Sequence, residues 1–258
     1  MGAAHTNASV QRQFGAVANA YANSAVHAAG PDLAALVQEA ALTGIERVLD
    51  MGCGAGHTAL ALAPKASSVV AVDVTAEMVA VATRLAAERG ITNLEVRQAD
   101  VSSLPFGDAE FDLVTSRLSA HHYADPQKAL QEAARVLKPG GKFLLIDTVA
   151  PEEPALDTFY QVWEFLRDAS HVRNWRATEW LRMAAAAGFK AEVIGRWAVP
   201  IDGADWVKRM QTPDSKAAMI RELFAEANPA QRAAFELRDE PWGMTQPFFL
   251  MKGLRTGD

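Results

Sequence analysis

The chain has 258 residues, of which 50% are hydrophobic and 22% charged, proportions typical of a folded protein rather than a disordered one. The length predicts one large domain with a substructure. The formal net charge of −6 argues against a nucleic acid as the main partner. The single cysteine, Cys53, excludes an intrachain disulfide and a multi-thiolate zinc site. Because long apolar runs and a signal-peptide pattern are lacking, we expect a cytoplasmic protein without a membrane segment.

Short β-branched runs alternate with longer helical patterns from residue 45 onward, which predicts βαβ units and an α/β fold with a parallel sheet. Five strands are expected at residues 45–51, 68–74, 94–99, 111–118 and 142–149. The first strand runs into the turn Gly52-Cys53-Gly54-Ala55-Gly56 and then a helix over 57–64. Thr75 is predicted to cap a second helix that ends before Gly90, and Asp125 to cap a third.

The second half of the chain continues this alternation after Pro154. The predicted elements are helices at 155–168 and 178–187, a strand at 190–199, a mostly helical stretch at 201–240 and a last strand at 247–254. Within the helical stretch, Thr212-Pro213 and Asn228-Pro229 each supply an N-cap and a proline start. The total is seven strands in a mostly parallel sheet, with helices on both faces.

The glycine turn after the first strand is the first candidate for a binding site, because ligands of such sheets bind beyond the carboxyl ends of the strands. Gly52, Gly54 and Gly56 allow close approach of a ligand and expose amides at a helix N-terminus, which suits a carboxylate or phosphate. Asp73 ends the second strand, where it can accept hydrogen bonds from ribose hydroxyls. An adenosine-containing cofactor is therefore expected. The alternative is that the glycines only allow close packing of helix and strand.

Four segments in order resemble the class I S-adenosylmethionine-dependent methyltransferases, within them the small-molecule group related to ubiquinone and menaquinone biosynthesis. These segments are VLDMGCGAGHTALAL, VVAVDVTAEMVAVA, EVRQADVSSLPFGDAEFDLVTSRLSAHHYADP and ALQEAARVLKPGGKFLLIDTVAPE. Asp50, Gly52, Gly54 and Gly56 match the first motif of that family position by position. A nicotinamide-binding fingerprint would need glycine at position 57, which is His57 here. A dehydrogenase is therefore the poorer interpretation.

The resemblance implies S-adenosyl-L-methionine as the cofactor, with its methionine part against the glycine turn and its ribose on Asp73. It also implies that Val74 and Met78 flank adenine, and that Asp100 and Val101 meet the adenine amino edge. Two further residues are candidates for the cofactor site. Tyr21 lies in a stretch that resembles the family's lid helix. Arg117 is either a helper near the cofactor or a buried charge paired with a carboxylate.

Three parts of the chain are expected, the first from the resemblance and the last from the helical pattern of residues 201–240. Residues 1–40 are expected to form N-terminal lid helices. Residues 41–200 with 244–255 are expected to form a Rossmann-like cofactor-binding domain. Residues 201–243 are expected to form a helical substrate cap inserted between strands.

Candidate catalytic groups follow the fourth strand, where His121 and His122 are positioned to act as a general base if the acceptor carries a proton. Neighbouring residues in a turn rarely face the same way, so one imidazole is expected in the pocket and one in a structural role, with a slight preference for His122 in the pocket. Adjacent histidines lack the i, i+4 spacing of a helical metal site, so no metal is expected. Cys53 is expected to pack rather than to act as a nucleophile.

Substrate recognition is expected from residues outside these motifs. His27 lies on the lid stretch, and His171 and Arg173 could recognise an acidic or polar acceptor or simply tie down their own loop. All six tryptophans follow residue 160, which favours a planar or hydrophobic small molecule as acceptor. A homodimer is left open.

The function predicted from these features is methyl transfer to a small organic acceptor with release of S-adenosylhomocysteine. Two alternatives remain. The same fold and cofactor can serve elimination, cyclisation or displacement, because fold does not fix the reaction. The second alternative is a regulatory protein that binds the cofactor but catalyses no reaction.

Overall fold

The computed structural model describes residues 3–22 and 28–257. The helices are α1 (Ala3–Ala22), α3 (Pro31–Ala40), α4 (His57–Leu62), α5 (Ala76–Glu88), α6 (Pro126–Val136), α7 (Pro154–Arg167), α8 (Ala177–Ala186), α9 (Gly203–Arg209), α10 (Asp214–Ala225) and α11 (Pro229–Phe235). The strands are β1 (Arg47–Met51), β2 (Ser68–Asp73), β3 (Leu94–Gln98), β4 (Phe111–Arg117), β5 (Leu137–Thr148), β6 (Phe189–Asp202), β7 (Arg238–Asp239) and β8 (Trp242–Arg255). Short 3-10 turns follow α4 and β4, namely η1 (Ala63–Lys65) and η2 (Ala120–His122).

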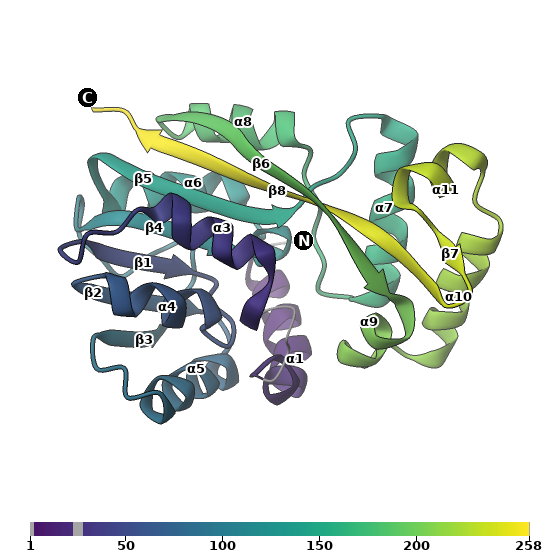
Figure 1. Ribbon diagram of the computed structural model, residues 1–258, viewed down its shortest axis with the longest axis horizontal. Coiled ribbons are helices and arrows are strands. Elements are labelled where there is room, and N and C mark those ends of the chain that lie inside the picture. The colour runs from purple at the N-terminus through teal and green to yellow at the C-terminus, as the bar shows by residue number, and fades with distance from the viewer. Residues whose placement is uncertain (1–2, 23–27, 258) are drawn as a thin grey trace.

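Within the described residues, one mixed sheet of eight strands runs through the molecule (Figure 1). Its order is β3-β2-β1-β4-β5-β8-β6, and the first five strands of this order are parallel. β8 is antiparallel to both β5 and β6. The prediction of seven strands is wrong by one. The extra strand, β7, pairs with β8 over only two residues, which is too short to leave an alternating pattern in the sequence.

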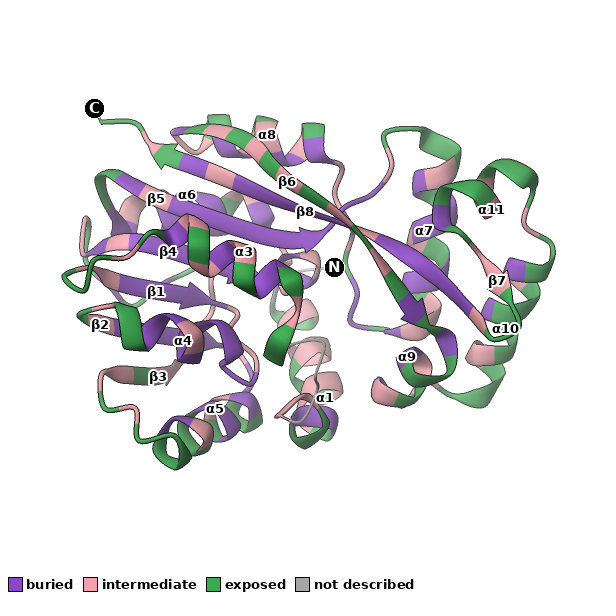
Figure 2. Ribbon diagram, viewed as in Figure 1, coloured by how far each residue is buried: buried purple, intermediate pink, exposed green. Residues whose placement is uncertain are grey.

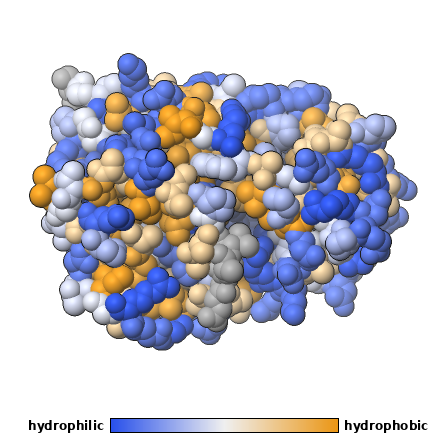
Figure 3. Space-filling view, viewed as in Figure 1, coloured by the Kyte–Doolittle hydropathy of each residue, from blue (hydrophilic) through white to orange (hydrophobic). Residues whose placement is uncertain are grey.

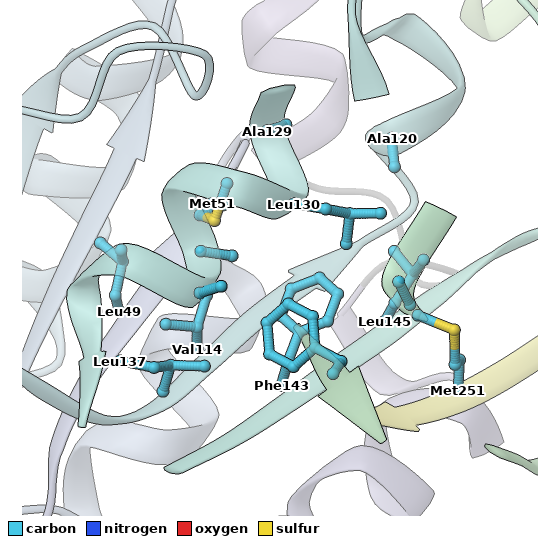
Figure 4. Packing of buried hydrophobic residues seen from close by; sticks show 14 of the residues in the cluster. Leu49, Met51, Val114, Ala120, Ala129, Leu130, Leu137, Phe143, Leu145 and Met251 are labelled. Carbon is cyan, nitrogen blue, oxygen red and sulfur yellow. The ribbon is translucent and has the colours of Figure 1, made fainter. Parts of the chain in front are cut away.

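Alternate residues of the central strands face two different layers of helices. Leu49 and Met51 of β1 belong to a cluster with residues of α6 and α8, whereas Val48 belongs to one with residues of α3 and α4. Figure 4 shows part of the first cluster, including Phe143 and Leu145 of β5. Figure 2 shows the central strands buried and the outward faces of the helices exposed. Helices on both faces of a mostly parallel sheet confirm the predicted α/β architecture.

Two long strands carry the chain beyond this sheet. β6 and β8 have 14 residues each and extend toward a group of helices at the right of Figure 1. Helices α9, α10 and α11 lie between these strands in the chain, and α7 packs against α10 and α11. We call α7 together with α9, α10 and α11 the helical end. It has its own core, which consists of Phe159, Tyr160, Trp163, Ile201, Trp206, Ile220, Phe224, Phe235 and Met244 with Ala150.

Helix α1 lies between the sheet and the helical end (Figure 1). It packs against α5 on the sheet side and contacts α9 on the other. Asn7 Nδ2 donates a hydrogen bond to Asp100 Oδ2 at 2.7 Å, and Gln13 Nε2 donates one to the carbonyl of Met210 at 2.9 Å. One helix therefore contacts both parts of the molecule.

The predicted helix caps are correct where a side chain is free to turn back onto the backbone. Asp125 accepts a hydrogen bond from the amide of Lys128, and Asn228 forms a reciprocal capping box with Gln231. Gly90 has a φ of +65°, as expected after the end of α5.

Two predicted caps are wrong. Thr75 precedes α5, but its side chain makes no capping hydrogen bond, and its amide instead donates to Asp73 Oδ1. Helix α10 begins one residue later than expected, after Pro213. The hydroxyl of Thr212 donates to the carbonyl of Arg167 at 2.9 Å, which ties this turn to the end of α7.

The surface carries mixed polar and apolar groups. Figure 3 shows more apolar side chains over the sheet than over the helical end on this face. Among the helices of the described residues, none has the length and hydropathy needed to cross a membrane.

Candidate active site

The turn between β1 and α4 brings the backbone close to two neighbouring elements. Gly52, Gly54 and Gly56 have φ values of +65°, +52° and +84°, in the region that favours glycine. A Cβ at Gly52 would lie 2.6 Å from Ser119 Oγ, and one at Gly56 would lie 2.9 Å from the Cβ of Ala82. A Cβ at Gly54 would meet nothing within 4 Å, because this glycine faces open space. The outer glycines therefore serve packing, and the middle one leaves room for a ligand.

Two buried carboxylates lie at the ends of the strands beside this turn, Asp50 in β1 and Asp73 in β2. Asp50 accepts a hydrogen bond from the hydroxyl of Thr115 at 2.7 Å, and burial raises the pKa of Asp50 to about 7. Its Oδ2 is buried without a hydrogen-bond partner among the described residues. Asp73 accepts hydrogen bonds from the amides of Gly54 at 2.8 Å and Thr75 at 2.9 Å. The pKa of Asp73 is raised by burial, which these amides partly offset.

Cys53, which lies between the glycines, does not have the surroundings of a nucleophile. Burial, followed by the nearby carboxylates of Asp73 and Asp50, raises the pKa of the Cys53 thiol well above its usual value. The side chain therefore stays a thiol and packs against the sheet.

A cavity of about 990 Å³, counted to its open mouth, begins at this turn; we call it the first cavity. Most of the residues predicted to bind the cofactor line it, namely Gly52, Gly54, Asp73, Val74, Met78, Asp100, Val101, Arg117 and Tyr21, together with His122. Asp50 lies beneath the turn and Gly56 precedes α4, and neither lines the cavity. Asn7, Val10 and Phe14 of α1 complete the wall.

Asp100 is fixed at the rim of the first cavity by its neighbours. Its Oδ1 accepts hydrogen bonds from the amide and the hydroxyl of Ser102, both at 2.8 Å, and its Oδ2 accepts the one from Asn7. Arg117 also lines the cavity, and its Nε donates to Asp32 Oδ2 at 2.6 Å in a nearly fully buried ion pair. Arg117 is thus both a residue of the cavity wall and a buried charge paired with a carboxylate.

His121 stands on η2 and is oriented by a carboxylate at the end of β5. Its Nδ1 lies 2.6 Å from Asp147 Oδ1, and its amide donates to Asp147 Oδ2 at 2.9 Å. Burial lowers the pKa of His121, but the adjacent Asp147 carboxylate outweighs burial and raises the pKa above the ordinary value. With Nδ1 donating to the carboxylate, the neutral ring has its unprotonated nitrogen at Nε2. His121 therefore has the arrangement of a general base.

His122 has different surroundings. Its Nδ1 lies 3.1 Å from the carbonyl of Ser170, and the ring packs edge to face on Phe14 with centroids 4.9 Å apart. Burial, and then the charge of His121, lower the pKa of His122 to about 4. The ring is therefore neutral in the physiological range and packs as a wall residue.

A second cavity of about 590 Å³ adjoins the first, because the two share Phe14, Tyr21, Leu118 and His122 in their walls. His121 opens onto the second cavity and not the first. The remaining walls come from β5, β6, β8 and the helical end, namely Thr148, Glu164, Arg167, Ile201, Trp206, Arg209, Met210, Gln246 and Phe248. Burial raises the pKa of Glu164 to about 7, and Glu164 accepts a hydrogen bond from the side-chain Nε2 of Gln246.

The residues predicted to recognise the substrate lie elsewhere. His171 is buried outside both cavities, with its Nε2 3.1 Å from Gln161 Oε1, and burial lowers its pKa to about 2. Arg173 pairs with Asp157 at 2.6 Å. The backbone amide of Arg173 donates to the carbonyl of His121 at 3.1 Å, so this loop supports η2 from behind. His27 lies outside the described residues.

Several residues in and behind the two cavities were not predicted from the sequence. Asp147 ends an apolar strand, as Asp50 and Asp73 do, and this position is the signal that could have found it. Asn7, Glu164, Arg167 and Arg209 belong to helices and Gln246 to β8, all without a motif, and only the fold brings them together.

The first cavity fits S-adenosylmethionine by its chemistry. Gly54 leaves a cradle that a Cβ would enter, because nothing lies within 4 Å of that position. Asp73 has lone pairs beyond those that accept the two amides, which suits ribose hydroxyls. Met78 and Val101 provide an apolar slot for a base.

Comparison with known proteins identifies the group to which the chain is related. The pattern of the family described as "Methyltransferase domain" matches residues 49–145. The chain is 42% identical to the uncharacterized methyltransferase YcgJ of Bacillus subtilis, over 86% of this chain and 88% of that protein. It is 33% identical to the demethylmenaquinone methyltransferase of Clavibacter sepedonicus, over 59% of this chain and 63% of that protein.

Solved structures agree with this relation. The crystal structure of YcgJ has a TM-score of 0.85 at 39% identity, covering 88% of this chain and 98% of that one. A putative methyltransferase from Bacillus halodurans also has a TM-score of 0.85, at 36% identity, covering 88% of this chain and 100% of that one. The chain therefore belongs to the class I S-adenosylmethionine-dependent methyltransferases and is an enzyme that uses this cofactor.

Proposed function

We propose that the chain transfers the methyl group of S-adenosylmethionine to a small organic acceptor held in the second cavity, with His121 as the general base. The observation that carries the proposal is the His121–Asp147 pair, which opens onto the second cavity beside the wall shared with the first. When bound, S-adenosylmethionine supplies an electrophilic methyl group on its sulfonium. The proposal departs from the preference of the sequence analysis for His122.

Each part of the site has a role in this proposal. Gly54 and Asp73 bind the cofactor, and Asp100 holds the adenine side. Phe14 and Tyr21 separate the cofactor from bulk water and form the wall at which donor and acceptor meet. His121 Nε2 takes the proton from the acceptor, and Asp147 stabilises the imidazolium that results. Alignment of the two reactants supplies the rest of the acceleration.

Three parts of the chain would have different roles in this reaction. We propose residues 1–40 as the lid, residues 41–200 with 244–255 as the cofactor-binding domain and residues 201–243 as the substrate cap. The contacts of α7 with α10 and α11 indicate that α7 supports this cap. The acidic net charge and single cysteine favour a small cytoplasmic acceptor over a nucleic acid.

Variants of the two histidines, assayed with an acceptor that the enzyme methylates, test whether His121 is the general base. Incubation with methyl-labelled S-adenosylmethionine and candidate acceptors should give a labelled product and S-adenosylhomocysteine, and product analysis would reveal elimination or cyclisation instead. His121→Ala is expected to lower turnover by about 10²-fold or more with little change in cofactor affinity. His122→Ala, the neighbouring control, should cost much less.

The pH dependence gives an independent check. The base works only when neutral, so the rate should fall as pH drops through the pKa of His121, with a midpoint above about 6.5 because Asp147 raises that pKa. Asp147→Asn removes the charge, so its midpoint should move to lower pH. Flat profiles and mild losses in both histidine variants would show that alignment alone drives the reaction and would remove His121 from the mechanism.

A further inference from the structure

The second cavity contains two arginines that no described carboxylate neutralises directly. Arg167 ends α7 and Arg209 ends α9, and both line the cavity. Neither has a carboxylate oxygen within 4 Å among residues 3–22 and 28–257. Arg209 Nε is buried without a hydrogen-bond partner in the same part of the chain. Both arginines are half-buried, so an anion in the cavity would stabilise their charges more than it would at the open surface.

The contacts of Arg167 are with neutral groups. Its Nε donates to the carbonyl of Trp206 at 3.3 Å, and its guanidinium lies 4.7 Å from the centroid of the Trp206 ring. Its side chain also forms a hydrogen bond with the Tyr21 hydroxyl. Burial raises the pKa of that hydroxyl, and the charges of Arg167 and Arg209 partly offset the rise. These contacts hold Arg167 in place without cancelling its charge.

The acids around the arginines are engaged with other partners. Glu164 accepts from Gln246, and with a pKa near 7 it carries only part of a charge at neutral pH. Asp168 accepts hydrogen bonds from the amide and the hydroxyl of Ser170 through Oδ1, whereas its buried Oδ2 has no hydrogen-bond partner among the described residues. The charge of Asp168 interacts with Arg167 without an ion pair between them, and Asp147 binds His121. Asp205 lies on the exposed side of α9.

The two positive charges also repel each other. Burial, and after it the charge of Arg167, lower the pKa of Arg209. An anion placed between the guanidiniums would relieve this repulsion and form charge-assisted hydrogen bonds with both. Guanidinium groups match the planar carboxylate especially well, because each presents paired N–H donors.

We propose that Arg167 and Arg209 together bind a carboxylate of the methyl acceptor in the second cavity. The inference rests on the proposed function, since it assigns this cavity to the acceptor. The rest of the acceptor has an apolar body, because Phe14, Ile201, Trp206, Met210 and Phe248 form the other walls. The acceptor class is therefore a small aryl or alkyl carboxylate, held by its acid group with the reacting atom toward His121.

Calorimetry with simple probes tests the anion site without turnover. Protein loaded with S-adenosylhomocysteine is titrated with benzoate, phenylacetate, cinnamate and octanoate, and with the matching carboxamides. At least one carboxylate should bind, and its amide at least about 10-fold more weakly, as expected for loss of a charged hydrogen-bond partner. Arg209→Gln should weaken carboxylate binding by about 10-fold or more. Arg209→Lys should have an intermediate affinity, because lysine keeps the charge but lacks the paired N–H donors of the guanidinium.

Lys208→Gln is the matched control, since Lys208 is the exposed neighbour on the same helix and lines neither cavity. It should bind carboxylates as the unchanged protein does, and all variants should keep their affinity for S-adenosylhomocysteine. The proposal is overturned if no carboxylate binds, if amides bind equally well, if Lys208→Gln is equally impaired, or if Arg209→Gln weakens S-adenosylhomocysteine instead. Preferential binding of phenyl phosphate would overturn the choice of a carboxylate. Failure of the proposed function would appear separately, as no acceptor-dependent release of S-adenosylhomocysteine.

Discussion

Asp73 combines two tasks in one carboxylate, because it orders the glycine turn through the amide of Gly54 and faces the first cavity. Asp73→Ala is expected to weaken binding of S-adenosylhomocysteine by about 2 to 3 kcal/mol, since it removes a charged acceptor from two hydroxyls. Isothermal titration measures this loss. Asp108→Ala is the control, because Asp108 is 78% exposed and pairs only at the surface with Arg135. Equal losses in both variants, or unfolding of Asp73→Ala, would mean that Asp73 is structural.

Some candidate site residues can be chosen from the sequence because reactive side chains directly follow the predicted end of a strand. Asp73 and the two histidines became candidates because they follow strand ends, and Asp100 because its segment resembles the methyltransferase family; all four lie at the two cavities. The choice between His121 and His122 was not predictable, because it depends on Asp147, which reaches η2 only through the packing of β5 beside β4. Thr75 was misjudged because its amide is already bonded to Asp73, which takes the place of a side-chain cap.

In the turn between β1 and α4, Gly56 allows close packing of α4 against α5, whereas Gly54 leaves room for a ligand. Gly56→Ala is expected to destabilise the fold by roughly 1 to 2 kcal/mol, because alanine is strained in the left-handed backbone conformation of this residue. The new Cβ would also lie 2.9 Å from the Cβ of Ala82, and this clash adds to the cost. Gly54→Ala has the same backbone cost but no clash, and its methyl group points into open space. It should therefore impair cofactor binding more than Gly56→Ala does. Urea unfolding and titration of both variants measure the two effects, and a reversed order would contradict these two roles.

The elements themselves differ in how far the sequence predicts them. The alternation of β-branched and helical runs gave the parallel sheet, and Asn228-Pro229 gave the start of α11 correctly. The meeting of Arg167 with Arg209 could not be predicted. Those residues belong to helices far apart in the chain, and only β6, which carries α9 back toward α7, brings them to one cavity. The tryptophans of the helical end were read as signs of a pocket, but Trp163 belongs to its core, and Trp206 both joins that core and lines the second cavity.

For the whole molecule, cofactor binding should appear as added stability. A ligand present at about 1,000 times its Kd stabilises the folded state by roughly 4 kcal/mol. In a chain of 258 residues this corresponds to a rise in Tm of roughly 8 to 16 °C. S-adenosylhomocysteine in the millimolar range should produce such a rise, given micromolar affinity, and NAD should produce none. A thermal melt in which NAD stabilises the protein and S-adenosylhomocysteine does not would contradict the cofactor site.

Helix α1 hydrogen-bonds Asp100 at the rim of one cavity and Met210 at the rim of the other. Phe14 and Tyr21, which it carries, belong to both walls. If the second cavity holds the acceptor, as proposed, a movement of this helix that opens the first cavity would also open the second. On the proposed assignment, the release of S-adenosylhomocysteine and that of the methylated product would then depend on the same helix.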